Sequence, residues 1–189
     1  VVTLTPTAVT LTRELPGRVS AVRVAEVRAR VSGIVEKRLF SEGSDVKAGE
    51  LLYRIESAPF EASLASARAS LARAEATLAR ARSSAARDAA LLAENTVSRE
   101  AVETSATAQQ AAQADLAAAK AAVQTAKINL DYTRVTAPVA GRIGRSVVTE
   151  GAYVQGSAAT LMATIQQLDS VYVDVTQSAT ELLRLRREL

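Results

Sequence analysis

The sequence predicts an elongated fold of mixed α and β structure, in which a long antiparallel coiled-coil hairpin interrupts a small β-sandwich. Two observations predict it: an alanine-rich stretch with a seven-residue apolar repeat, and two similar segments on either side of that stretch. Of the 70 residues from Ala58 to Lys127, 27 are alanine. The flanking segments, residues 33–46 and 141–154, align without a gap at an offset of 108 residues.

Each half of the alanine-rich stretch carries one apolar stripe with the heptad spacing of a coiled-coil seam. In the first half the seam positions are Leu64, Leu71, Leu78, Ala85 and Leu92. A second set of seam positions, three residues later in the chain, is filled by Ala67, Ala74 and Ala81. In the second half the seam positions are Val102, Leu116, Val123 and Leu130, interrupted by Gln109. The set three residues later in the chain is Ala112, Ala119 and Ala126. A charged residue, Asp88, occupies one seam position, so looser packing is expected there.

Between the two halves, the sequence from Asn95 to Ser98 predicts a turn. These residues are poor helix formers, and Ser98 is a good N-cap that is followed by Glu100 and Glu103 in the first turn of the next helix. The tip of the hairpin is therefore expected at residues 95–98, and each arm would be about 50 Å long. Alanine buries little area per residue, so the hairpin is expected to be a stiff spacer without a core of its own.

Composition excludes several classes of function. The net charge is only +3, and the basic residues are spread along the chain, so nucleic acid is not an expected partner. Absence of cysteine and histidine excludes thiol chemistry, disulfides and the commonest zinc ligands. No apolar run approaches the 18 residues typical of a membrane span. The chain begins at Val1 without a start methionine, from which we expect a mature or trimmed fragment.

The segments around the hairpin have the pattern of β-strands. Residues 1–25 alternate β-branched and polar side chains and are interrupted by prolines, which predicts one or two strands that need a partner sheet. The two repeated segments are each expected to form a short strand and a turn containing Glu-Gly, followed by a further strand at residues 51–55 or 161–165. The identical positions are Gly33 with Gly141, Glu42 with Glu150, Gly43 with Gly151, and Val46 with Val154.

Four of these glycines, Gly33, Gly43, Gly141 and Gly151, are assigned to turns, where they can supply the positive φ angles that tight turns often need. Halves of about 30 residues cannot bury a core alone, so the strands on the two sides of the hairpin must pair with each other. A chance match between two glycine-containing turns is the alternative.

These residues resemble a known family. A sandwich of two quasi-equivalent halves is similar to a biotinyl/lipoyl carrier domain, and its interruption by an alanine-rich hairpin resembles the periplasmic adaptors, or membrane fusion proteins, of tripartite RND-type efflux pumps of the MexA/AcrA type. The segments that carry the resemblance are residues 13–19 (RELPGRV), 34–51 (IVEKRLFSEGSDVKAGEL), 128–144 (INLDYTRVTAPVAGRIG) and 168–189 (LDSVYVDVTQSATELLRLRREL).

The resemblance implies a division of the chain into a split lipoyl-like sandwich, an inserted hairpin and parts of a β-barrel. The expected boundaries are 1–26 for N-terminal strands of the barrel or membrane-proximal region, 27–56 and 133–167 for the lipoyl halves, 57–132 for the hairpin, and 168–189 for the start of the barrel, which includes a short helix at residues 178–189.

The resemblance also implies partners and a location. The partners would be an inner-membrane RND transporter, an outer-membrane channel of the TolC/OprM type, and further copies of the adaptor in a hexamer. The location would be the periplasm of a Gram-negative bacterium, with an N-terminal lipid anchor absent from this chain. An adaptor of an ABC-type exporter has the same architecture and is the alternative.

Adaptors of this family resemble one another near the hairpin tip, where an Arg is followed four residues later by Leu and seven residues after that Leu by Ser. Here these positions are Arg87, Leu91 and Ser98, and Val97 lies beside them. On the heptad, Arg87 falls at position c and Leu91 at g, both off the seam, which indicates an exposed mixed patch. Alternatively, Arg87 is a solvated charge and Leu91 a residue flanking the seam.

An enzyme is not expected, and neither are catalytic residues, a cofactor or a metal. The carboxylate pairs Glu42/Asp45 and Glu50/Glu56 lie in turns or beside strands without a histidine, cysteine or phosphate-binding loop, and are interpreted as solvated. A carrier of a prosthetic group is also disfavoured. Its modified lysine would lie in the turn between the sandwich halves, which the hairpin occupies, whereas Lys37 lies in a strand and Lys47 in another turn.

Overall fold

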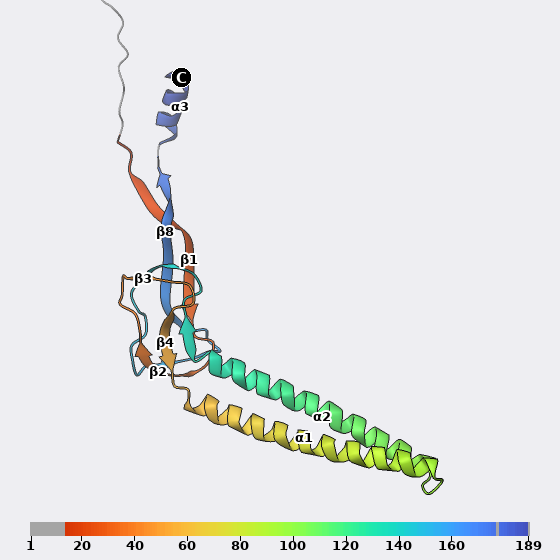
Figure 1. Cartoon of the computed structure of the whole chain (residues 1–189). Coiled ribbons are helices and arrows are strands. Elements are labelled where there is room, and N and C mark those ends of the chain that lie inside the picture. Colours follow the sequence, from red (N-terminus) through yellow and green to blue (C-terminus); the bar gives the residue numbers. More distant parts are fainter. Residues whose placement is uncertain (1–13, 177, 189) are drawn as a thin grey trace, which may run out of the picture.

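A computed structural model describes residues 14–176 and 178–188. It confirms the predicted fold class: a β-sandwich from which a long helical hairpin extends to one side (Figure 1). The elements in chain order are β1 (Gly17–Arg28), β2 (Gly33–Arg38), β3 (Asp45–Val46), β4 (Leu51–Ile55), α1 (Ala58–Ala93), α2 (Arg99–Asp131), β5 (Arg134–Thr136), β6 (Gly141–Ile143), β7 (Tyr153–Val154), β8 (Leu161–Val175) and α3 (Ala179–Glu188). The strand expected in residues 1–13 lies outside the described residues.

The strands form two four-stranded sheets of equivalent topology. One sheet has the order β1-β8-β6-β3 and the other β5-β4-β2-β7. The repeat relates β2 to β6 and β3 to β7, and the following strands β4 and β8 are related in the same way. It extends beyond the segments that the sequence comparison aligned, because the buried residues Val27 and Ala29 occupy the places of Val135 and Ala137. The strands before and after the hairpin pair with each other, as predicted.

Backbone hydrogen bonds repeat between the halves. Gly43 N–H donates to the carbonyl of Ile143 at 2.9 Å, and Gly151 N–H donates to the carbonyl of Val35 at 2.8 Å. Each of these bonds joins one half of the repeat to the other. The two halves are therefore interlocked at the backbone, which is the physical reason that neither can complete a sheet alone.

The glycines shared by the repeats serve two different purposes. Gly43 and Gly151 have φ angles of 77° and 83°, in the left-handed region that favours glycine. Gly33 has no positive φ, so the expectation of a turn conformation is wrong for it. A Cβ on Gly33 would lie 2.8 Å from Cγ2 of Ile55, and one on Gly141 would lie 2.5 Å from the carbonyl oxygen of Gln166. These two glycines allow close approach between strands.

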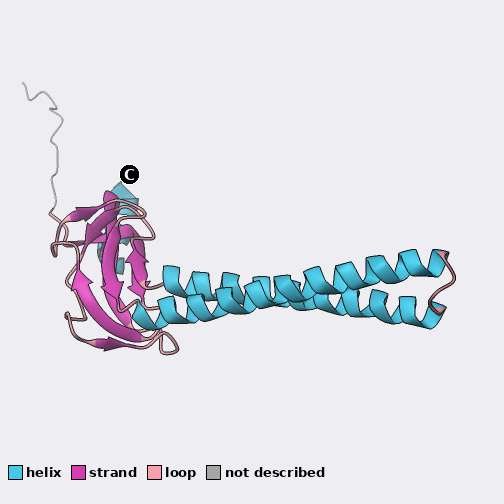
Figure 2. Cartoon of the chain, turned by 60° about the horizontal axis from the view of Figure 1, so that its bottom comes forward, coloured by secondary structure: helices cyan, strands magenta, loops and turns pink. Residues whose placement is uncertain are grey.

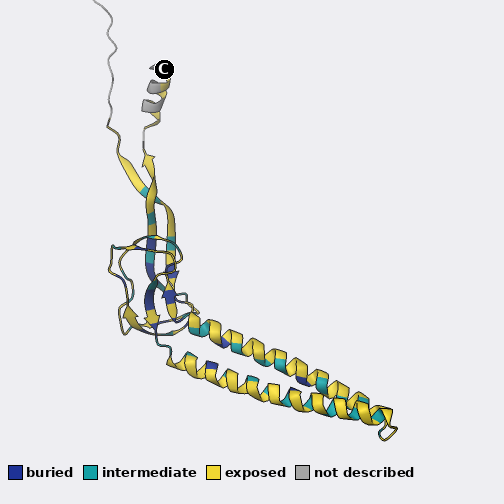
Figure 3. Ribbon diagram, in the orientation of Figure 1, coloured by how far each residue is buried: buried dark blue, intermediate teal, exposed yellow. Residues whose placement is uncertain are grey.

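The hydrophobic core lies between the two sheets, and Figure 3 shows buried residues concentrated there. Tyr53 is fully buried, and its ring meets that of Phe40 edge-on at 5.2 Å. The Tyr53 hydroxyl lies 2.6 Å from the hydroxyl of Ser146 and donates to the carbonyl of Met162 at 3.0 Å. Burial raises the pKa of Tyr53, so the phenol stays protonated within this network.

The first and last long strands continue beyond the sandwich as a two-stranded ribbon. β1 pairs with β8 in antiparallel register from Gly17 opposite Val175 to Arg28 opposite Leu161, with irregularities on the way. The expected boundaries at 26/27 and 167/168 fall inside these strands, which pass without a break from the sandwich into the ribbon (Figure 1). Helix α3 follows, close to the place where the sequence predicts a short helix.

The hairpin extends far from the sheets as two helices that lie side by side along their whole length (Figure 2). Helix α1 has 36 residues and α2 has 33, which correspond to arms of about 50 Å. Every predicted seam position on both helices is buried or half-buried, and most of the intervening positions are exposed. Leu64, Leu78, Ala112 and Ala126 are buried most deeply, so the heptad repeat predicts the packed face correctly.

The base of the hairpin contributes to the sandwich core. Phe60, in the first turn of α1, and Tyr132, directly after α2, are partly buried against the core residues. The hairpin has no core of its own, but its base adds two side chains to the core of the sandwich. Phe60 lies seven residues before Ala67, so extending the seam by one heptad towards the N-terminus would have marked it.

Candidate docking site at the hairpin tip

The chain ends α1 and reverses direction through a compact turn. Asn95 has a positive φ of 55°, which this residue type tolerates better than most. The backbone N–H of Asn95 donates to the carbonyl of Leu92, and both the N–H and the hydroxyl of Thr96 donate to the carbonyl of Leu91, at 3.0 and 2.8 Å. These bonds satisfy carbonyl groups at the end of the helix and fix the turn relative to Leu91.

Helix α2 begins with the predicted cap. The side-chain oxygen of Ser98 accepts the backbone N–H of Ala101 at 3.2 Å, and Ser98 has the extended conformation typical of an N-cap. Glu100 lies in the first turn, where its negative charge is favourable to the helix dipole. Ser98 thus has a structural role whether or not it also meets a partner.

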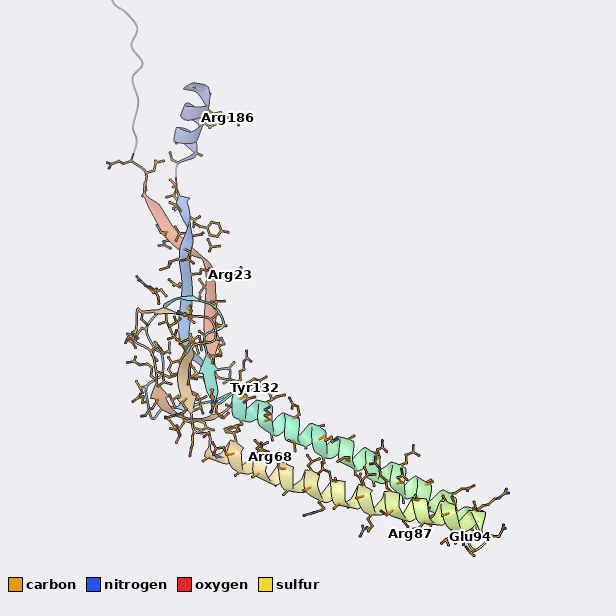
Figure 4. The ribbon with its side chains drawn as sticks, in the orientation of Figure 1. Arg23, Arg68, Arg87, Glu94, Tyr132 and Arg186 are labelled. Carbon is orange, nitrogen blue, oxygen red and sulfur yellow. The ribbon has the colours of Figure 1, made fainter. Side chains whose placement is uncertain are left out.

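Arg87 and Leu91 lie one turn apart near the distal end of α1, and both are exposed. Leu91 retains 38% exposure, unlike the seam residue Leu92 beside it, which is half-buried. None of the described residues forms an ion pair or a side-chain hydrogen bond with Arg87. Figure 4 places Arg87 and Glu94 at the far end of the hairpin from the sandwich. With respect to the described residues, the tip therefore presents an unpaired guanidinium group and an apolar side chain.

Val97 is half-buried, whereas Arg87, Leu91 and Ser98, the residues predicted to lie with it at the docking tip, are exposed. Part of its surface stays accessible in the turn, directly before Ser98. We name the set Arg87, Leu91, Val97 and Ser98 the tip patch.

The seam opens beside the tip patch. A shallow groove of about 510 Å³ lies between the two helices at this level. It is lined by Ser84, Asp88, Ser98, Glu100, Ala101, Thr104, Ser105 and Ala108. The charged seam residue Asp88 and its small polar neighbours leave space unfilled, in line with the expected loosening.

Three of the four carboxylates interpreted as solvated, Glu42, Asp45 and Glu50, are exposed but also have structural partners. Glu42 accepts the backbone N–H of Ser146 at 3.0 Å and pairs with Arg38, while Glu50 accepts the backbone N–H of Lys47 at 2.8 Å. Asp45 pairs with Arg142 at 3.3 Å. The identity of the Glu-Gly turn in the two repeats was the signal in the sequence that could have revealed the role of Glu42.

The other features weighed from the sequence lie apart from the tip. Lys37 lies in β2 and Lys47 in the turn after β3, and the whole hairpin occupies the connection between β4 and β5. The described residues contain no group of acidic, histidine or cysteine side chains that could hold a metal ion. No helix in the described part of the chain combines the length and hydrophobicity that crossing a membrane requires.

A split sandwich with an inserted coiled-coil hairpin is the architecture of membrane fusion proteins. The family model described as the barrel-sandwich hybrid domain of RND membrane fusion proteins matches residues 23–166. The chain is 51% identical over 189 residues to the multidrug efflux pump subunit AcrA of Escherichia coli K12, and 53% identical over 191 residues to the multidrug resistance protein MexA of Pseudomonas aeruginosa. These alignments cover all of this chain, and 48% and 46% of the two relatives.

Solved structures show the same architecture. A crystal structure of a MacA-MexA chimeric protein, which contains the Pseudomonas aeruginosa MexA α-hairpin domain, is 29% identical, with a TM-score of 0.61 over 88% of this chain and 56% of the chimera. A membrane fusion protein of Streptococcus pneumoniae R6 has a TM-score of 0.69 over 89% of this chain and 72% of its own, at 20% identity, and shows the fold alone.

The chain belongs to the RND membrane fusion protein family. It spans about half the length of the curated relatives it matches.

Proposed function

We propose that the chain is the central part of a non-catalytic periplasmic adaptor, which joins an inner-membrane RND transporter to an outer-membrane channel of the TolC/OprM type in a multidrug efflux pump. The observation that carries the proposal is the exposed tip patch, held about 50 Å from the sandwich by a stiff hairpin. Membership of the family supports it, as do the names of its relatives, which include a multidrug efflux pump subunit and an antibiotic efflux pump periplasmic linker protein.

The chemistry of the tip patch suits a protein partner. A guanidinium group without an internal ion pair can donate several hydrogen bonds in a fixed geometry to carboxylate or carbonyl oxygens. Leu91 adds apolar area one helical turn away, so a polar anchor and an apolar contact lie side by side. The hydroxyl hydrogen of Ser98 donates to none of the described residues, which leaves it available to an acceptor on the channel.

We also propose that the parts of the chain have the separate roles that membership of the family implies. The sandwich of residues 27–56 and 133–167 would carry the hairpin of residues 57–132, while residues 1–26 and 168–189 would lead towards a barrel that meets the transporter. The ribbon of β1 and β8 supports this division, because it leaves the sandwich at a different end from the hairpin (Figure 1). In the complete pump the adaptor would form a hexamer in the periplasm, with an N-terminal lipid anchor.

The test is to purify the full-length adaptor from its own cell envelope and to identify the proteins that accompany it. A single cysteine placed at Val97 supports crosslinking of the tip, since this chain contains no other cysteine. We expect an RND transporter and an outer-membrane channel in the preparation, with the crosslink formed to the channel. Co-purification with an ABC transporter, or a crosslink only to the transporter, would contradict the proposal.

A further inference from the structure

The direction of the hairpin depends on how its base is attached to the sandwich. Helix α1 follows β4 and α2 leads into β5, and these two strands pair with each other in the sheet β5-β4-β2-β7. Both covalent connections of the hairpin therefore belong to one sheet. A contact from the other sheet, or from the loop after β1, would add to the packing of Phe60 and Tyr132 against the core in restraining tilting of the hairpin relative to the sandwich.

The loop after β1 supplies one such contact. The guanidinium carbon of Arg30 lies 5.1 Å from the centre of the Tyr132 ring, within the range of a cation–π interaction. Tyr132 is the residue that caps the end of α2, and Figure 4 shows it where the hairpin meets the sheets. No ion pair among the described residues joins the end of α2 to this loop.

Both partners are held firmly by their own surroundings. The buried neighbours Ala29 and Val31 fix Arg30 in the alternating pattern that directs its side chain outwards. A Cβ on Gly156 would lie 2.6 Å from the carbonyl oxygen of Arg30, so this loop is packed closely against the backbone of residue 156. On the other side, the residue after Tyr132 is Thr133, which is 1% exposed and donates from its hydroxyl to the carbonyl of Leu130.

Space beside the contact leaves room for movement. A cavity of about 670 Å³ lies between β1, its following loop and the end of α2, and Arg30, Asp131, Tyr132 and Arg134 are among the residues that line it. An arm of about 50 Å that tilts by about 10° at its base displaces its tip by about 9 Å. A small change of tilt at the base therefore has a large effect on where the tip patch lies.

We propose that Arg30 and Tyr132 form a clamp that sets the direction of the hairpin relative to the sandwich. They act as positioning residues for the tip patch, which neither of them touches. The clamp itself is independent of the partner, and only its consequence for channel docking rests on the proposed function.

The test measures the distance from the sandwich to the tip in the full-length adaptor. Spin labels on cysteines introduced at Lys47 and Glu94, both exposed, report the distribution of this distance by pulsed electron paramagnetic resonance. We expect Arg30→Gln and Tyr132→Leu each to widen the distribution at least twofold, and the double variant to widen it no further. Arg30→Lys and Tyr132→Phe keep a cation and an aromatic ring, and should retain the narrow distribution.

Arg28→Gln is the matched control. Arg28 lines the same cavity, but it pairs with Glu26 at 2.7 Å and donates to the carbonyl of Ala159 instead of contacting Tyr132. The distance distribution of the Arg28→Gln variant should equal that of the unaltered adaptor. An unchanged distribution in Arg30→Gln would overturn the clamp, and because Arg30 is exposed this variant decides the question even if Tyr132→Leu folds poorly.

Crosslinking of residue 97 to the channel tests separately whether the clamp affects docking. A wider distribution in Arg30→Gln together with weaker crosslinking supports both the clamp and its role in docking. A wider distribution with full crosslinking supports the clamp and overturns that role. Absence of crosslinking in the unaltered adaptor would contradict the proposed function and leave the distance measurement valid.

Discussion

The backbone N–H of Arg38 donates to the carboxylate of Glu150 at 2.9 Å, although the two residues lie on opposite sides of the hairpin in the sequence. The equivalent bond, 108 residues away, joins the N–H of Ser146 to the carboxylate of Glu42 at 3.0 Å. Each glutamate of a Glu-Gly turn thus binds the backbone of the other half. The two turns act as a reciprocal pair of braces, which explains why the same acidic residue stands in both repeats.

A first prediction tests these braces. Glu150→Ala should lower the free energy of unfolding by about 1 kcal/mol, because the N–H of Arg38 loses its partner at an edge that water can reach. Glu150→Gln retains an acceptor oxygen and should cost less than half as much. Urea unfolding followed by circular dichroism measures both values, and equal losses for the two variants would show that the hydrogen bond does not act as a brace.

A second prediction concerns Arg87. Arg87→Glu should leave helix content and melting temperature nearly unchanged, because exposed substitutions of this kind usually change stability by about 0.5 kcal/mol or less. At a docking interface, the reversed charge should cost roughly 2 to 5 kcal/mol of binding free energy. Drug susceptibility of cells that carry the variant should then rise although the adaptor is folded and abundant.

Arg73→Glu is the control for this experiment. Arg73 occupies the same heptad position two heptads, or about four helical turns, nearer the sandwich and is likewise exposed. It should be tolerated in the susceptibility assay and in crosslinking from residue 97. If the two variants export equally well and crosslink equally well, docking by the tip patch is wrong while the fold assignment stands.

A third prediction separates the two roles of Ser98. Ser98→Ala removes the cap of α2 and should cost about 1 kcal/mol of stability. Ser98→Asp restores a capping oxygen and the stability, but it replaces a hydroxyl donor by a negative charge. If the tip meets the channel, Ser98→Asp should impair export despite normal unfolding in urea. Full export by the aspartate variant would assign Ser98 a structural role alone.

A fourth prediction follows from the partly buried base of the hairpin. Replacing residues 64–126 by a short turn keeps Phe60 and Tyr132 against the core, whereas replacing residues 60–130 removes Phe60. Both shortened proteins should fold as β-sandwiches. The second should be less stable by about 1 to 2 kcal/mol, since a fully buried phenylalanine contributes about 1.5 to 3 kcal/mol and this one is partly buried.

Dispersed NMR spectra and urea midpoints provide the measurement. Equal stability of the two shortened proteins would mean that Phe60 contributes nothing to the core. Failure of both to fold would contradict the view that the sandwich is complete without the long helices.

The periodic parts of the fold could be predicted from the sequence because their physical causes are local or repeated. The seven-residue spacing of Leu64, Leu71 and Leu78 fixes the packed face of α1, and the cap at Ser98 fixes the start of α2. The offset repeat gives the pairing between sandwich halves, since identical turns in identical positions imply equivalent strands.

The parts that could not be predicted depend on contacts between residues far apart in the chain. Arg30 and Tyr132 meet only because the hairpin base and the loop after β1 converge, and neither residue carries a sequence signal of its own. A glycine at position 33 is compatible both with a turn and with close packing between strands. Only the closeness of Ile55 in the folded protein shows that close packing is the reason. For the tip patch, the sequence gives the exposure of Arg87 but no description of what it meets.

The equivalence of the two sheets has a mechanical consequence. β4 and β5 hold the helical arm, and the related strands β8 and β1 hold the ribbon, so the two arms leave from corresponding places in opposite sheets. The chain crosses between the sheets after β1, β2, β3, β5, β6 and β7. Tension between the tip and the ribbon is therefore carried through covalent crossings as well as through strand pairing. These crossings oppose separation of the two sheets when the tip and the ribbon are pulled apart.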